Sequence, residues 1–189
     1  MLHGSPGSGK STLARALFEQ LRVAEQTVAV IDPDELNLVH PDQGRAFWQR
    51  NLQVIWPNYI AMGALRAIIP TVIADAEDHR HLRVALPASR LIICELIAPM
   101  AILKQRVLAR EPNEHWKREL EKWVDVYHQR DESQRFGDFQ VTTHDKSVDD
   151  TAAEILEQAG WKGCCTVSWT RCTSSAAMES RRRSWICAG

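Results

Sequence analysis

Short apolar runs alternate with longer stretches whose apolar positions recur at helical spacing along most of this chain. The apolar runs, which we expect to be strands, cover residues 1–3, 27–32, 65–69, 90–98 and 139–144. The stretches with helical spacing cover residues 10–24, 44–64, 75–86, 99–110, 114–135 and 149–159. Continuous apolar strands joined by helices are typical of a parallel sheet that is covered on both faces. The pattern therefore predicts a three-layer α/β fold around a parallel sheet of about five strands.

Prolines and acidic residues mark the boundaries of these predicted elements. Pro57 should break or kink the second helix, because proline removes a backbone hydrogen bond inside a helix. Pro70 should end the third strand, and Pro99 should open the helix that follows the fourth strand. Asp149 or Asp150 should cap the last helix, since a carboxylate can accept from the free N–H groups of a first turn.

The composition changes after residue 162. The remaining segment has one acidic residue, Glu179, several arginines and no sustained periodicity. One interpretation is a basic tail that binds nucleic acid or acidic lipid. We favour an irregular segment that is disordered or non-native, because its Trp, Cys and Arg residues are scattered without pattern. The sequence therefore predicts one domain over residues 1–162, followed by a tail over residues 163–189.

The segment HGSPGSGKST, close to the N-terminus, carries the strongest chemical signal. Gly4, Gly9, Lys10 and Ser11 fit the pattern G-x-x-x-x-G-K-[ST], in which backbone N–H groups surround a phosphate. The pattern lies between a predicted strand and a predicted helix, which is the context that a phosphate loop requires. Only three residues precede it, so we expect the first strand to be truncated. The predicted nucleotide-binding residues are Gly4, Ser5, Pro6, Gly7, Ser8, Gly9, Lys10, Ser11 and Thr12.

The acidic segment IDPDELNLVHPD, residues 31–42, follows the second predicted strand. Asp32 and Asp34 stand at the edge of the sheet where ligands bind in folds of this kind. We expect Asp32 to hold Mg²⁺ together with the Ser11 hydroxyl, and Asp34 to orient an acceptor hydroxyl and take its proton. Lys10 would contact the β- and γ-phosphates. The alternative is that both acids are solvated turn residues around Pro33.

The phosphate loop followed by this acid-x-acid step resembles the P-loop small-molecule kinases of the adenylylsulfate-kinase and gluconate-kinase kind. The run IDPDELNLVHPD is also similar to a segment of zeta toxins, which phosphorylate a UDP-amino sugar. Residues 50–69 and 149–161 look closer to bacterial AAA-family ATP-binding proteins of the same kinase-like group. The resemblance implies the P-loop NTPase fold, ATP and Mg²⁺ as cofactors, and Asp34 as the proposed base.

A lid that follows the fourth strand usually supplies positive charge to the transition state in the kinase group. Residues 103–119 have that position and composition, with a break at residues 111–113 as the expected hinge. Arg106 and Arg110 are four residues apart and so share one helix face. We expect Arg110, then Arg106, to be catalytic by reaching the phosphates, or to stack on adenine. The alternative is a solvated helix face with Glu111 and Glu114 as local partners.

These motifs predict an ATP- and Mg²⁺-dependent phosphotransferase that acts on a small-molecule acceptor with a hydroxyl group. A zeta-toxin-like nucleotide-sugar kinase, and a nucleotide-dependent ATPase or switch without transfer activity, are the alternatives. A net charge of −1, with no long apolar run and no leader pattern, predicts a cytoplasmic protein without a membrane partner or specific nucleic-acid partner. The acceptor and the oligomeric state stay open.

Overall fold

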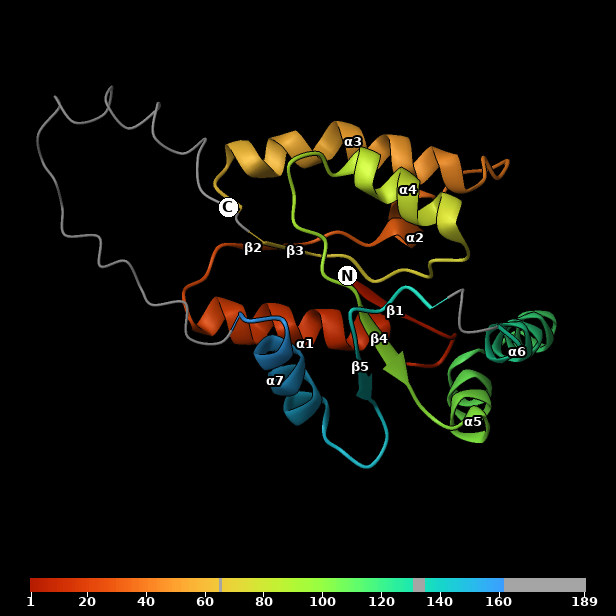
Figure 1. The fold of residues 1–189 in the computed structure, drawn as a ribbon. Helices are drawn as coiled ribbons and strands as arrows, with labels where there is room; N and C mark the ends of the chain where they lie inside the picture. Colours follow the sequence, from red (N-terminus) through yellow and green to blue (C-terminus); the bar gives the residue numbers. More distant parts are fainter. Residues whose placement is uncertain (65, 131–134, 162–189) are drawn as a thin grey trace, which may run out of the picture.

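The computed structural model describes residues 1–64, 66–130 and 135–161 (Figure 1). The predicted tail over residues 163–189 lies outside the described residues, as does part of the predicted helix over residues 114–135. None of the described helices is long and apolar enough to span a membrane. The elements are β1 (Leu2–Gly4), α1 (Lys10–Val23), β2 (Val28–Val30), α2 (Pro33–Leu36), α3 (Arg45–Ala61), β3 (Arg66–Ile68), α4 (Ala76–Ala85), β4 (Cys94–Ile97), α5 (Met100–Arg110), α6 (Glu114–His128), β5 (Phe139–Thr142) and α7 (Val148–Gln158).

All strand pairs that the structure describes are parallel. β1 pairs with β4 and β4 with β5, while β2 pairs with β3. The two sets meet at one bridge, where Leu2 N–H donates to Ile69 O at 3.0 Å and Thr71 N–H donates to Leu2 O at 2.9 Å. The spatial order is therefore β2-β3-β1-β4-β5. The expected parallel sheet is present, as a three-stranded and a two-stranded part joined at β1.

Helices cover both faces of these strands (Figure 1). On one face α1 and α7 enclose a core that contains Leu2, Leu96 and Val141. On the other face α3 and α4 enclose a second core around Ile69 and Ile73. The pair α5–α6 lies beside the three-stranded part and has a small core of its own, formed by Leu103, Val107 and Val124. The predicted three-layer fold is confirmed, with α5–α6 as an addition at one end.

Most predicted boundaries agree with the structure. β3 ends just before Pro70, and Pro99 is the N-cap of α5, as expected. The predicted break at Pro57 is wrong, because α3 continues through that residue. Buried residues of α3 on the preceding turns hold the helix against its core, which offsets the one missing hydrogen bond.

The cap of the last helix also differs from the prediction. Ser147, and not Asp149 or Asp150, caps α7 by accepting from Asp150 N–H at 3.0 Å. The two acids occupy the first turn instead, where they complement the helix dipole. A further difference is α2, a single turn within the acidic segment that sequence periodicity did not indicate.

Candidate functional site

The phosphate loop connects β1 to α1 at the carboxyl edge of the central strand. Gly4 and Gly7 of this loop are required by close backbone approach. A Cβ on Gly7 would lie 2.6 Å from Leu103 O, and one on Gly4 would lie 2.8 Å from Leu96 O. Gly7 also has φ +78°, which disfavours other residues. The loop is therefore pressed against β4 and α5 and exposes its backbone to the opposite side.

Several polar groups of this loop have no partner among the described residues. The hydroxyls of Ser5 and Ser8 are buried without a hydrogen bond. The helix α1 begins at Lys10 without a side-chain cap. Buried polar groups without partners are costly, and uncapped N–H groups at a helix start form an anion site. These features fit a bound phosphate, which accepts from hydroxyl and N–H groups alike.

The Lys10 ammonium folds back over the loop. Its Nζ donates to Gly4 O at 2.9 Å and to Ser5 O at 3.1 Å. Loss of hydration on burial lowers the pKa of Lys10 to about 8, while the nearby Asp34 carboxylate opposes this shift and Arg110 adds to it. The predicted phosphate-binding lysine thus lies at the loop, within electrostatic reach of groups from α2 and α5.

Asp32 and Ser11 lie together at the same edge of the sheet. One carboxylate oxygen of Asp32 accepts from Asp34 N–H at 3.0 Å and so caps α2. Its other oxygen accepts from the Ser11 hydroxyl at 3.5 Å. Hydroxyl and carboxylate oxygens are the ligands that Mg²⁺ prefers, usually together with substrate phosphates and water. The Ser11 and Asp32 oxygens therefore fit Mg²⁺ that is carried in with a nucleotide. A site made of three or more His, Cys, Asp or Glu side chains is not found among the described residues.

Asp34 occupies an exposed position in the single turn of α2. Loss of hydration beside its neighbours, and then repulsion from Asp32, raises the pKa of this carboxyl, while Lys10 opposes the shift. A raised pKa moves a carboxylate toward the range in which it accepts a proton from a hydroxyl effectively. Because the Lys10 charge acts on the Asp34 pKa, the two groups lie close enough for their charges to interact.

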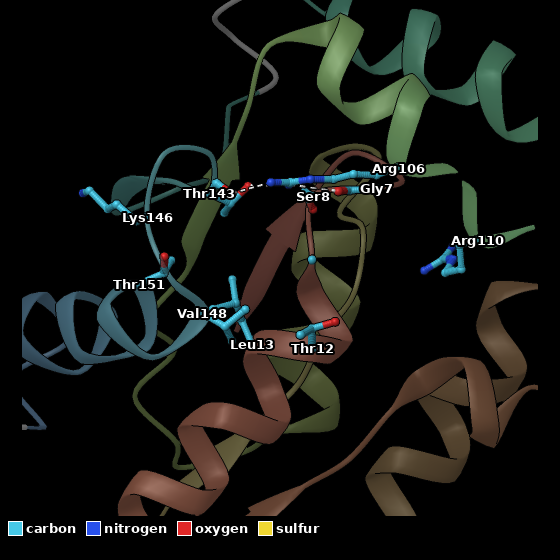
Figure 2. Close-up of a pocket in the computed structure, with 11 residues that line it drawn as sticks. Gly7, Ser8, Thr12, Leu13, Arg106, Arg110, Thr143, Lys146, Val148 and Thr151 are labelled. Carbon is cyan, nitrogen blue, oxygen red and sulfur yellow. Dashed lines mark hydrogen bonds between the residues drawn. The ribbon is translucent and has the colours of Figure 1, made fainter. Parts of the chain in front are cut away.

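A pocket of about 310 Å³ opens between the phosphate loop, α5 and the segment that leads from β5 into α7 (Figure 2). Lys146, Val148 and Thr151 were not predicted to belong to the site, because nothing in the local sequence links them to the loop. Asp32 and Asp34 do not line this pocket. The lining residues are Gly7, Ser8, Gly9, Thr12, Leu13, Arg106, Arg110, Thr143, Lys146, Val148 and Thr151.

The two predicted arginines have different surroundings. Arg106 lies across the top of the pocket, where it donates to Thr143 Oγ1 at 3.1 Å, to Thr143 O at 2.6 Å and to Gly7 O at 3.4 Å (Figure 2). Arg110 lines the same pocket and makes no hydrogen bond or ion pair with the residues described. Arg106 thus joins the phosphate loop to the loop after β5, whereas the Arg110 guanidinium has no such protein partner.

Comparisons with known proteins agree with this architecture. A family model described as an AAA domain matches residues 1–130. No curated protein sequence matches the chain significantly. Among solved structures, the chain is similar to the APS kinase of Mycobacterium tuberculosis in complex with AMPPNP and APS. The two share 20% identity with a TM-score of 0.60, over 84% of this chain and 95% of that one.

Two further structures have the same fold. The tunicamycin resistance protein of Deinococcus radiodurans shares 22% identity with a TM-score of 0.59, over 84% of this chain and 93% of that one. A sugar kinase from Janibacter shares 17% identity with a TM-score of 0.60, over 85% and 93%. The expected likeness to P-loop small-molecule kinases and AAA-family proteins is confirmed at the level of fold and family. The chain belongs to the AAA domain family, because the family model matches more than half of the chain.

Proposed function

We propose that this protein is an ATP- and Mg²⁺-dependent phosphotransferase that acts on the hydroxyl group of a small molecule. The observation that carries the proposal is the position of Asp34, a carboxylate with a raised pKa beside Lys10 and the phosphate loop. A protein that only binds a nucleotide has no need for a second carboxylate next to the metal-binding one, whereas an attacking hydroxyl or water needs a group that orients it. An acceptor hydroxyl needs such a group to take its proton.

The nucleotide would occupy the loop and the pocket beside it. The triphosphate fits the loop, where Ser5, Ser8 and the start of α1 offer unpartnered donors. The adenine end fits the pocket between Thr12 and Val148, below the Arg106 guanidinium. Ser11 and Asp32 would hold Mg²⁺, which neutralises charge on the β- and γ-phosphates when bound. The AMPPNP and APS in the similar APS kinase support ATP as the donor.

The reaction follows from the residues around the loop. The acceptor oxygen forms a bond to the γ-phosphorus while its proton passes to the Asp34 carboxylate. The bond between that phosphorus and the β,γ-bridging oxygen breaks, and ADP leaves with the electron pair. Lys10 at the loop and Arg110 at the pocket would supply positive charge that stabilises the transferred group.

The test is a screen with labelled ATP and a pool of small metabolites. The wild-type protein should label one acceptor, and Asp34→Asn should label it about 10²–10⁴-fold more slowly, since a positioned base contributes that much. Glu35→Gln, on the same turn, is the matched control and should label it normally. Nucleotide affinity should stay within a few-fold in both variants, because neither residue lines the pocket.

Other outcomes separate the alternatives. Binding and hydrolysis of ATP without any labelled acceptor would contradict the proposal and favour an ATPase or switch. Labelling of UDP-sugars alone would identify a zeta-toxin-like kinase. Full transfer by Asp34→Asn would show that another group takes the proton.

A further inference from the structure

A buried hydrogen-bonded network lies directly behind the phosphate loop and takes no part in the chemistry proposed above. His3 on β1 is completely buried, and Glu95 on β4 is 6% exposed. Tyr127 on α6 lies between them and contacts both. Polar groups in such a place are costly unless each has a partner, and a fully satisfied network fixes the geometry of the elements that contribute to it.

The hydrogen bonds of this network have a defined direction. Ile73 N–H donates to His3 Nδ1 at 3.0 Å, so the neutral ring carries its proton on Nε2. In this tautomer His3 Nε2 donates to the Tyr127 hydroxyl oxygen at 3.1 Å, while Arg130 Nη1 lies 3.3 Å from the same nitrogen. The Tyr127 hydroxyl donates to Glu95 Oε1 at 2.9 Å. Gln140 completes the network by donating to Glu95 Oε2 at 2.7 Å. Tyr127 therefore supplies one donor and one acceptor that no apolar ring could replace.

The neutral state of His3 agrees with these contacts. Loss of hydration on burial, and then the positive charge of Arg130, lowers the pKa of His3 to about 3. The Arg130 guanidinium lies over the Tyr127 ring, 4.4 Å from its centre. It also donates to Ile73 O at 2.6 Å and to Ala74 O at 3.3 Å. Arg130 thus fastens the end of α6 to the segment after β3, beside the Tyr127 contact.

The network connects two parts of the nucleotide site. His3 directly precedes Gly4, whose carbonyl oxygen accepts from Lys10 Nζ. On the other side, Tyr127 belongs to α6, which is bound to α5 by their shared apolar core and by the ion pair of Lys104 with Asp125 at 2.7 Å. The helix α5 carries both pocket arginines. The start of the phosphate loop is thus linked through His3 and Tyr127 to the helices that present those arginines.

We propose that Tyr127 is a positioning residue, which fixes the position of the α5–α6 pair relative to the phosphate loop through its hydrogen bonds to His3 and Glu95. The benefit to catalysis rests on the proposed function, because it requires a nucleotide for Arg106 and Arg110 to approach. The mechanical link is a property of the fold alone. Small displacements of groups that act on a transition state reduce the rate strongly, by about 10²-fold for a misplacement of ~1 Å.

The test uses Tyr127→Phe in the full chain. This variant keeps the ring under Arg130 and loses both hydrogen bonds. We expect faster hydrogen–deuterium exchange in residues 2–12 and in α5 without nucleotide, with exchange in α3 and α4 unchanged. In ATP turnover we expect kcat to fall about 10–10²-fold with KM within threefold, since misplaced arginines act mainly on the transition state. Tyr59→Phe is the matched control, because the Tyr59 hydroxyl makes no hydrogen bond with the described residues.

The conservative variant Glu95→Gln separates hydrogen bonding from charge. Its amide oxygen still accepts from Tyr127, and the Gln140 amide can turn over to accept from the new NH₂ group. Exchange and kcat should therefore remain close to wild type, in contrast to Tyr127→Phe.

Three results decide against the proposal. Unchanged exchange in residues 2–12 of Tyr127→Phe would show that the loop does not depend on α6. An equal increase over the whole chain, including α3 and α4, would show a contribution to global stability only. A loss of loop protection in Glu95→Gln equal to that in Tyr127→Phe would show that the network acts through its charge. If the wild-type protein neither binds nor turns over ATP, the proposed function fails, while the exchange comparison still decides whether the link exists.

Discussion

The phosphate loop and the acidic segment stand at the same edge of the sheet and are built differently. The loop, residues 4–12, is pressed against β4 and α5, and two of its glycines, Gly4 and Gly7, are required by backbone contacts. The acidic segment, residues 31–42, is largely exposed and contains one helical turn. Every nucleotide presents the same phosphates, so one backbone arrangement serves all of them. Under the proposed function the acidic segment would recognise an acceptor by side chains suited to that molecule, and such a region is expected to carry little general pattern.

Among variants of the loop and the pocket, we expect the largest effect from Lys10, and its comparison with Asp34 distinguishes the two regions. Lys10→Ala should reduce ATP turnover about 10²–10³-fold with any acceptor, because one preorganised donor to the transferred phosphate is lost. Its nucleotide affinity should also fall, whereas Asp34→Asn should retain that affinity. Isothermal titration with ATP and a turnover assay would measure the two effects. Lys122→Ala, at an exposed position of α6, is the control. Equal nucleotide affinity in Lys10→Ala and wild type would contradict the role of Lys10.

The two arginines should differ in which step they affect. Arg110→Ala should lower kcat about 10²-fold with a smaller change in KM, since the Arg110 guanidinium lines the pocket and makes no hydrogen bond or ion pair with the described residues, which leaves it available to the transferred phosphate. Arg106→Ala should mainly raise the Kd for nucleotide, about tenfold, because its bonds to Thr143 and Gly7 shape the pocket. Steady-state kinetics together with binding measurements would separate these cases. Identical profiles for the two variants would show that the arginines act as one unit.

Backbone contact, in addition to the backbone angle φ, should determine how strongly an alanine at Gly7 of the loop destabilises the protein. Gly7 and Gly63 both have positive φ, +78° and +86°. Alanine at either position carries strain of about 1–2 kcal/mol. At Gly7 the added Cβ also meets Leu103 O at 2.6 Å, while at Gly63 nothing lies within 4 Å among the described atoms. Urea unfolding should therefore show Gly7→Ala to be less stable than Gly63→Ala by about 1–3 kcal/mol. Equal stabilities would mean that the loop relaxes away from α5.

The smallest expected effect is a pH dependence of nucleotide binding. Lys10 has a pKa of about 8 in the free protein and is charged below it. The Kd for ATP should be nearly constant below about pH 8 and should rise above it by at most tenfold per pH unit, as the ammonium loses its proton. Lys10→Arg should lack this dependence, because a guanidinium stays charged. A flat profile for the wild type up to pH 9.5 would contradict the lowered pKa.

Elements with a strong periodic pattern were predictable, and elements shorter than that pattern were not. The first and last residues of helix α1 and strand β2 differ from their expected positions by at most two residues. The turn α2 has four residues, which is too short to show helical periodicity. Pro57 was expected to break or kink α3, but the helix is not broken there, because packing of its buried face outweighs one lost hydrogen bond. Local propensity yields to tertiary contacts at such positions.

The candidate site divides in the same way. The glycines, Lys10 and Ser11 are fixed in sequence spacing, because they all lie in one strand–loop–helix unit that must wrap around a phosphate. The pairing of Ser11 with Asp32 was expected from parallel strand order, since both follow strands that end at one edge. Lys146 and Thr151 were missed, as they reach the pocket only through the position of α7 against α1.

The sequence by itself determined the phosphate loop and the α/β class, because both depend on local backbone geometry and on repeating apolar positions. Tertiary structure alone decided that Arg106 binds Thr143, 37 residues away, and that Tyr127 binds His3, 124 residues away. Hydrogen bonds over such separations leave no periodic trace in a single sequence. They form when strand order and helix packing bring the side chains together. Only this packing determines which group donates and which group accepts.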